Sequence, residues 1–243
     1  AFDKLPVLLK KLDGKLGGTL SAFEVLWNNY YRLVTTEPAK QRPPLDQDYP
    51  YYVLIEAMGG DPEKDKARVE SALEEAFEAG LVEDAVLAQS EAQRNEMWAI
   101  RDDVEQTMRY EPCYVYDVSL RISDMENYVE QVNRNLAAKF GNYTNFAFGH
   151  MGDGNLHFAV SAGKDSSSHH DVNLCVYEPL RAINGSVSAE HGVGLEKKAY
   201  LDISRNESEV NLMRLLKRSL DPRGILNPGK IFDTQNSMSV NAA

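Results

Sequence analysis

The stretch Phe146-Ala-Phe-Gly-His-Met-Gly-Asp-Gly-Asn-Leu-His-Phe-Ala-Val160 decides the fold of this chain. Two apolar segments, Phe146–Phe148 and Leu156–Val160, flank a glycine-rich turn, which predicts two antiparallel strands joined tightly. The glycines let the turn residues take positive φ angles. Cross-strand neighbours have Cβ atoms about 4.5–5.5 Å apart. The hairpin should therefore bring His150 and His157 close together.

Helices and strands alternate along the rest of the chain. Capping patterns, Pro and Gly signals and apolar spacing predict the other elements. The Pro-rich residues 35–50 are predicted to form an extended linker or loop between the first helix and the first strand. The predicted helices span 21–34, 61–80, 123–141, 171–183 and 207–220, with another that begins at Ser90 and carries Arg101; strands are predicted at 51–56, 85–88 and 114–120.

This order of elements predicts an α+β fold, with helices packed on one face of a largely antiparallel sheet. The order strand–helix–strand occurs twice, around residues 51–88 and 114–148. Two ferredoxin-like halves would explain that repetition.

Composition excludes several classes of protein. The 243 residues carry a net charge of −11, and their basic residues are scattered, which excludes nucleic acid as the main partner. No stretch approaches the roughly 20 apolar residues of a membrane span. Cys113 and Cys175 are far apart, and we interpret them as thiols of a reducing compartment. We expect a cytoplasmic protein, or a mitochondrial matrix protein in a eukaryote.

Two short blocks carry the chemistry. His150 and His157 are joined by Glu190 and His191, which lie between small residues in Ser-Ala-Glu-His-Gly-Val-Gly194. Two imidazoles and a carboxylate from distant segments are typical of a catalytic metal site with an open position. His191 then remains as a base. The alternatives are a hairpin with two incidental histidines and a solvated turn.

Other charged residues are more ambiguous. Arg101 follows Trp98 on a predicted helix, where it can bind an anionic substrate or pair with Asp102 or Asp103. Lys197-Lys198 is predicted to lie on a solvated helix face. The chain has neither a Rossmann or Walker phosphate loop nor a Gly-x-Ser-x-Gly nucleophile elbow.

Three motifs together resemble one family. The motifs are Gly149-His-Met-Gly-Asp-Gly-Asn-Leu-His157, Ser188-Ala-Glu-His-Gly-Val-Gly194 and Leu220-Asp-Pro-Arg-Gly-Ile-Leu-Asn-Pro-Gly-Lys230. In this order they resemble the C-terminal part of FAD-linked D-2-hydroxy acid dehydrogenases, the vanillyl-alcohol-oxidase-like flavoproteins that act on D-lactate, glycolate or D-2-hydroxyglutarate. Leu20–Glu24 and Tyr52–Glu56 look most like the D-2-hydroxyglutarate branch.

The resemblance implies a role for each matching residue. His150, His157 and Glu190 match the ligands of a divalent metal, zinc or manganese, and His191 matches the base that removes the hydroxyl proton. Asn155 and Arg101 match residues that hold the substrate, and Asn227 and Lys230 match residues that contact FAD.

Two departures bear on the substrate. The D-2-hydroxyglutarate branch is expected to have a hydroxyl residue one turn after the substrate arginine and a lysine just before Tyr116-Asp117; here Glu105 and Val115 stand there. These changes weaken a site for a second carboxylate, so they favour a monocarboxylate such as D-lactate.

The resemblance also implies a missing part. Family members carry an N-terminal FAD-binding domain, so we expect a fragment that holds no flavin and is inactive alone. Residues 1–205 would form the substrate or cap domain, and residues 206–243 a helix and tail that pack on the missing domain. A small 2-hydroxy acid is the expected partner, with a protein or quinone electron acceptor; a homodimer is also compatible.

Two rival functions stay open. One is a metal-dependent module that binds a small acid without redox activity. The other is a metal-dependent hydrolase that uses the same side chains to activate water. Flavin reduction by a D-2-hydroxy acid separates both from a dehydrogenase.

Overall fold

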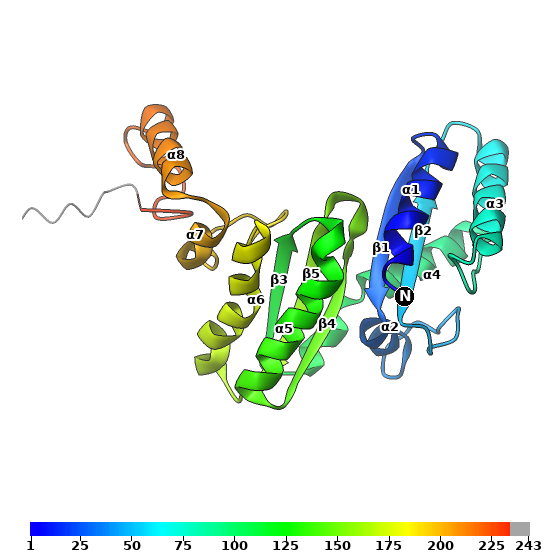
Figure 1. Cartoon of the computed structure of the whole chain (residues 1–243), viewed down its shortest axis with the longest axis horizontal. Coiled ribbons are helices and arrows are strands. Elements are labelled where there is room, and N and C mark those ends of the chain that lie inside the picture. The colour runs from blue at the N-terminus through cyan, green and yellow to red at the C-terminus, as the bar shows by residue number, and fades with distance from the viewer. Residues whose placement is uncertain (234–243) are drawn as a thin grey trace, which may run out of the picture.

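The computed structural model describes residues 1–233. Its centre is one antiparallel sheet in the order β2-β1-β4-β5-β3 (Figure 1). The strands are β1 (Leu20–Trp27), β2 (Tyr51–Ala57), β3 (Cys113–Ser119), β4 (Tyr143–His150) and β5 (Asn155–Ala162). The predicted α+β class and the antiparallel sheet are confirmed, and so is the hairpin of β4 and β5.

Helices make up most of the remaining structure. They are α1 (Lys4–Leu16), α2 (Asn28–Thr35), α3 (Pro62–Glu78), α4 (Glu91–Asp102), α5 (Met125–Phe140), α6 (His169–Ile183), α7 (Leu201–Ser204) and α8 (Glu207–Leu220). Short 3-10 helices lie at Val104–Arg109, Ile122–Asp124, Met151–Asp153, Ser166–Ser168 and Lys198–Tyr200.

The two faces of the sheet are covered unequally. Helices α1, α3, α5 and α6 pack with strand residues such as Val25 and Phe158 into the larger core. Helices α2 and α4 cover part of the other face, with Leu26 and Phe148 in a smaller core. The main helical layer thus lies on one face, as expected.

Two predicted elements are wrong. Residues 21–34 form β1 followed by α2, not one helix, because Phe23 and Val25 face one core while Leu26 faces the other. A central strand buried on both faces shows no polar alternation, so its apolar residues mimic helical spacing. Residues 85–88 form no strand.

The sheet is built from two similar halves. Each has the order helix–strand–strand–helix: α1-β1-β2-α3 with α2 inserted, and α5-β4-β5-α6. In both halves the two strands pair with each other and the two helices pack together. Strands β1 and β4 join the halves at the centre of the sheet.

The C-terminal helix stands apart from the sheet. Figure 1 shows α8 projecting beyond α7, and leucines such as Leu212, Leu216 and Leu220 are exposed on it. The predicted bounds of this helix are confirmed. The predicted boundary between a cap domain, residues 1–205, and a C-terminal part, residues 206–243, stays a prediction. Residues 234–243 of that C-terminal part lie outside the described residues. Among the described residues, no helix is long and apolar enough to cross a membrane.

Candidate functional site

Strand register gathers the polar residues of the site on one face of the sheet. His150 lies beside Glu24 of β1 on one side and Asn155 of β5 on the other. Two residues along, His157 lies beside Asp117 of β3. Cross-strand partners and residues two apart share a face. All five therefore belong to the face that carries α2 and α4.

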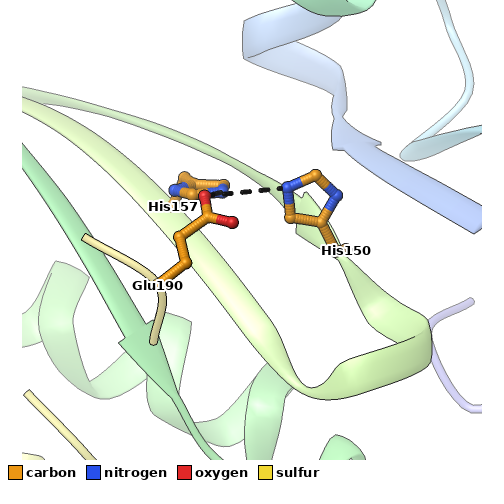
Figure 2. A group of neighbouring side chains, drawn as sticks. All are labelled: His150, His157 and Glu190. Carbon is orange, nitrogen blue, oxygen red and sulfur yellow. Dashed lines mark ion pairs between the residues drawn. The ribbon is translucent and has the colours of Figure 1, made fainter. Parts of the chain in front are cut away.

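Two histidines and a glutamate meet at the open end of this face. One nitrogen or oxygen atom from each of His150, His157 and Glu190 lies within 4.8 Å of the others. The Nε2 atoms lie 4.0 Å and 3.4 Å from Oε1 of Glu190, respectively. Figure 2 shows this carboxylate, from the loop after α6, beside both imidazoles. The expected convergence is confirmed; metal binding stays a prediction.

The electrostatics of the two imidazoles differ. Burial, with the positive charges of His150 and Arg101 nearby, lowers the pKa of His157 to about 4. This imidazole is therefore neutral near pH 7, which is the form that binds metals. A hydrogen bond to Glu24 raises the pKa of His150 instead. Glu190 keeps about half of its side chain exposed, so the cluster opens to solvent.

Glu24 and Arg101 hold His150 in place. Oε1 of Glu24 lies 2.7 Å from Nδ1 of His150, and its Oε2 accepts a hydrogen bond of 2.9 Å from Nε of Arg101. Arg101 Nη2 lies 2.9 Å from Nε2 of the same imidazole, and Nη1 pairs with Asp102 at 3.2 Å. Burial alone raises the pKa of Glu24, but His150 and Arg101 outweigh it and the pKa is lowered. Arg101 thus belongs to the site and also forms the ion pair with Asp102.

Asp117 organises the loop that supplies Glu190 and His191. Its buried carboxylate accepts hydrogen bonds from the backbone N–H groups of Ala189, Glu190 and His191 at 3.0, 2.8 and 3.0 Å. Lys197 also donates to it. Burial raises the pKa of Asp117, yet these donors outweigh burial and the pKa is lowered. Lys197 is buried, so the predicted solvated face is wrong for this lysine.

The candidate base and the substrate amide flank the cluster. The His191 side chain is 60% exposed, with Nε2 3.4 Å from Glu190 and Nδ1 3.4 Å from Asp117. Asn155 is buried, and its Oδ1 has no hydrogen-bond partner among the described residues. An unpaired buried acceptor is costly, so this amide oxygen is available to a ligand. The roles of both residues stay predictions.

The two candidate flavin contacts lie elsewhere. Asn227 and Lys230 are exposed on the segment after α8, and within residues 1–233 neither side chain forms a hydrogen bond or an ion pair with the histidines. The backbone links the regions indirectly, because Ile231 N–H donates to the carbonyl of Gly194, three residues after His191, at 2.8 Å.

Sequence reasoning missed three residues of the site. Glu24, Asp117 and Lys197 are buried and charged. Glu24 bonds to His150, Asp117 bonds to the backbone of Glu190 and His191, and Lys197 bonds to Asp117. The sequence does mark Glu24 and Asp117 as unusual, because each is a lone carboxylate inside a largely apolar run that forms a helix or strand. Buried charges need partners, but the sequence does not reveal which.

Comparison with known families agrees with this geometry. Residues 10–231 match the family described as FAD linked oxidases, C-terminal domain. The chain belongs to this family. The match includes both histidine blocks and the loop after α8, so every candidate site residue lies within the part of the chain that defines the family.

Curated relatives extend over nearly the whole chain. A D-2-hydroxyglutarate dehydrogenase of Xanthomonas citri pv. viticola is 37% identical over 98% of the chain and 50% of its own length. A mitochondrial D-2-hydroxyglutarate dehydrogenase of Arabidopsis thaliana is 37% identical over 93% of the chain and 40% of its own length. A Schizosaccharomyces pombe protein, provisionally named a mitochondrial D-lactate dehydrogenase, is 34% identical over 87% and 42%. The chain spans about half the length of the curated relatives it matches.

Proposed function

We propose that this chain is the substrate- and metal-binding part of a flavin-dependent dehydrogenase that oxidises a D-2-hydroxy acid to the 2-oxo acid. The observation that carries the proposal is the convergence of His150, His157 and Glu190 beside His191 and Arg101. Membership of the FAD-linked oxidase family supports it.

The side chains present fit a divalent metal ion. Two imidazoles and one carboxylate form the His₂Glu set of catalytic zinc sites, and manganese accepts the same donors. His157 is held neutral by burial, and Glu24 fixes the ring of His150 from the side away from the cluster, as second-sphere carboxylates do for metal-bound histidines. The metal supplies Lewis acidity toward the substrate's hydroxyl and carboxylate oxygens.

Each remaining residue then has a distinct task. Arg101 exchanges its contact with the His150 ring for the substrate carboxylate, and the Asn155 amide oxygen accepts a hydrogen bond from the substrate. His191 takes the proton of the 2-hydroxyl group, since it is exposed beside the cluster and is steadied through the loop bound by Asp117.

FAD is the oxidant implied by the family, and when bound it would supply the acceptor for the hydride that leaves C2 of the substrate. We propose that it is bound by a separate domain, against which α8 and the tail pack. The exposed leucines of α8 support such a contact. Asn227 and Lys230, exposed on the following segment, are the proposed contacts of this chain to FAD. A protein or a quinone would be the final electron acceptor.

The proposed substrate is a small D-2-hydroxy monocarboxylate such as D-lactate, with D-2-hydroxyglutarate as the second candidate. Val115 lies on the same face of β3 as Asp117, two residues from it, and is 44% exposed. An apolar residue there offers no charge to a second carboxylate. The names of several relatives favour D-2-hydroxyglutarate, so the two acids are compared directly.

The test is anaerobic flavin reduction in the full-length protein. D-Lactate and D-2-hydroxyglutarate are mixed with the oxidised enzyme, with L-lactate as the control, and flavin absorbance is followed. We expect bleaching by a D-acid, its loss after chelation, and its recovery when zinc or manganese is restored. A metal-dependent hydrolase would cleave esters or amides without bleaching the flavin, and a binding module would do neither; either result contradicts the proposal.

A further inference from the structure

The edge of the sheet at β2 carries a groove that the rest of the chain does not fill. The groove has a cavity volume of about 230 Å³. Its floor is β2, one wall includes Leu5 and Leu8 of α1, and another is the segment Leu81–Leu87. This feature is called the β2 groove below. In the described chain β2 pairs with β1 alone, so its outer edge has no strand partner.

The other end of the sheet shows what such a groove holds. There β3 precedes α5 and pairs antiparallel with β5, the second strand of its half. On its far side, Ser119 of β3 exchanges two backbone hydrogen bonds with Ser186, at 3.0 and 2.7 Å. Ser186 lies just after α6, so β3 is held between β5 and the segment that follows the last helix of that half.

The first half has every corresponding part except this strand. β2 corresponds to β5, α1 to α5 and α3 to α6. Segment Leu81–Leu87 follows α3 as Ser186 follows α6, and it lines the β2 groove opposite β2. The parts that enclose β3 at one end of the sheet are therefore also present at the other end (Figure 1), where they line the β2 groove.

We propose that the β2 groove binds a β-strand antiparallel to β2, formed by the stretch of the full-length protein that directly precedes Ala1. Five residues, 120–124, separate β3 from α5. The same spacing before Lys4, where α1 begins, puts the end of the added strand upstream of Ala1. The matched part is half or less of each of these relatives. The rest of such a chain can supply the added strand.

The chemistry of the groove defines the strand it accepts. Val53 and Ile55 pack with the larger core, and Leu54 lines the groove from the opposite face, so an added strand is covered on both sides. Strands buried on both faces are continuous runs of Val, Ile and Leu rather than alternating sequences. The proposal also explains why residues 85–88, predicted as a strand, form none here: a strand needs a partner for its backbone groups.

Hydrogen exchange tests the proposal directly. The exchange of peptides covering β2 and Leu81–Leu87 is compared between the 243-residue chain and the full-length protein. Amides in a native strand exchange only when it opens, so we expect exchange in the full-length protein to be slower by at least about tenfold in both peptides. Equal rates in the two proteins would overturn the proposal.

A matched pair of substitutions gives a second readout. Val86 lines the groove and is 45% exposed, whereas Val7 of α1 is 53% exposed and does not line it. Val86→Lys should leave the melting temperature of the 243-residue chain unchanged but lower that of the full-length protein by several degrees. Val7→Lys should change neither. An equal effect of Val86→Lys in both proteins would overturn the proposal.

Light scattering of the 243-residue chain distinguishes the upstream strand from another possible occupant of the β2 groove, a second copy of the chain. A monomer with fast exchange at β2 supports the upstream strand. A dimer in which β2 is already protected would assign the groove to a second copy and overturn the proposal.

Discussion

The substitution Asp117→Asn tests how the loop bearing Glu190 and His191 is held. Asp117 and Lys197 are 1% and 9% exposed at their side chains, and the carboxylate also accepts three backbone N–H groups. Removing one partner of a buried pair leaves the other charge uncompensated, which costs about 3–5 kcal/mol. We expect Asp117→Asn to lower the free energy of unfolding by that amount in urea denaturation followed by circular dichroism.

A double-mutant cycle makes this prediction specific. Lys197→Met should cost a similar amount, and the double variant should cost less than the sum by about 1–3 kcal/mol, because it leaves no unpaired charge. Lys198→Met is the matched control: its ion pair with Asp233 is 2.7 Å long but largely exposed at Asp233, so it should cost at most about 1 kcal/mol. Additive effects, or a cost for Asp117→Asn no larger than the control, would refute the reasoning.

Four further predictions concern the site. Glu24→Gln removes the carboxylate behind His150, so manganese affinity measured by calorimetry should fall about 10–100-fold; unchanged affinity would contradict that role. His191→Ala in the full-length enzyme should lower kcat about 10²–10⁴-fold with an unchanged circular dichroism spectrum, and near-normal turnover would remove it as the base. Since the pKa of His157 is about 4 against a usual 6.5, the unfolded chain binds more protons between these values. The metal-free chain should therefore lose stability as pH falls from 6.5 to 4, by at most about 1.4 kcal/mol per pH unit from this group, and His157→Phe should reduce that slope. Val115→Lys adds a cation on the substrate face, so kcat/KM for D-2-hydroxyglutarate should rise relative to D-lactate by about tenfold or more; an unchanged ratio would place the specificity elsewhere.

Local sequence patterns correctly predicted the helices that begin with a capping residue or a proline in the first turn. Asp61 caps α3 through a hydrogen bond to Lys64 N–H, and Pro62 occupies the first turn. The capping box of Asn206 and Glu209 begins α8. Such contacts lie within four residues of each other, so the sequence contains them directly. Helix α1 also carries a local signal, because Leu5, Leu8, Leu12 and Leu16 recur at helical spacing and form one buried face.

Non-local contacts explain the failures. Ser21-x-x-Glu24 resembles a capping box, yet Ser21 bonds to Glu56 of β2 and Glu24 to His150 of β4. The partners lie 35 and 126 residues away, and sheet pairing with them overrides the local helical pattern. The histidines and Glu190 were predictable because their types and glycine-rich setting indicate a ligand site. Their supporting charges depend on strand register, which the sequence alone did not fix.

Metal binding by the 243-residue chain tests the central claim most directly. The chain is loaded with zinc or manganese, dialysed and analysed for metal content, beside His150→Ala, His157→Ala and the control His169→Ala, an imidazole at the start of α6 outside the cluster. The account predicts about one ion per chain in the wild type and control, and loss from both cluster variants. Equal metal content in all four proteins, or none in any, would contradict it.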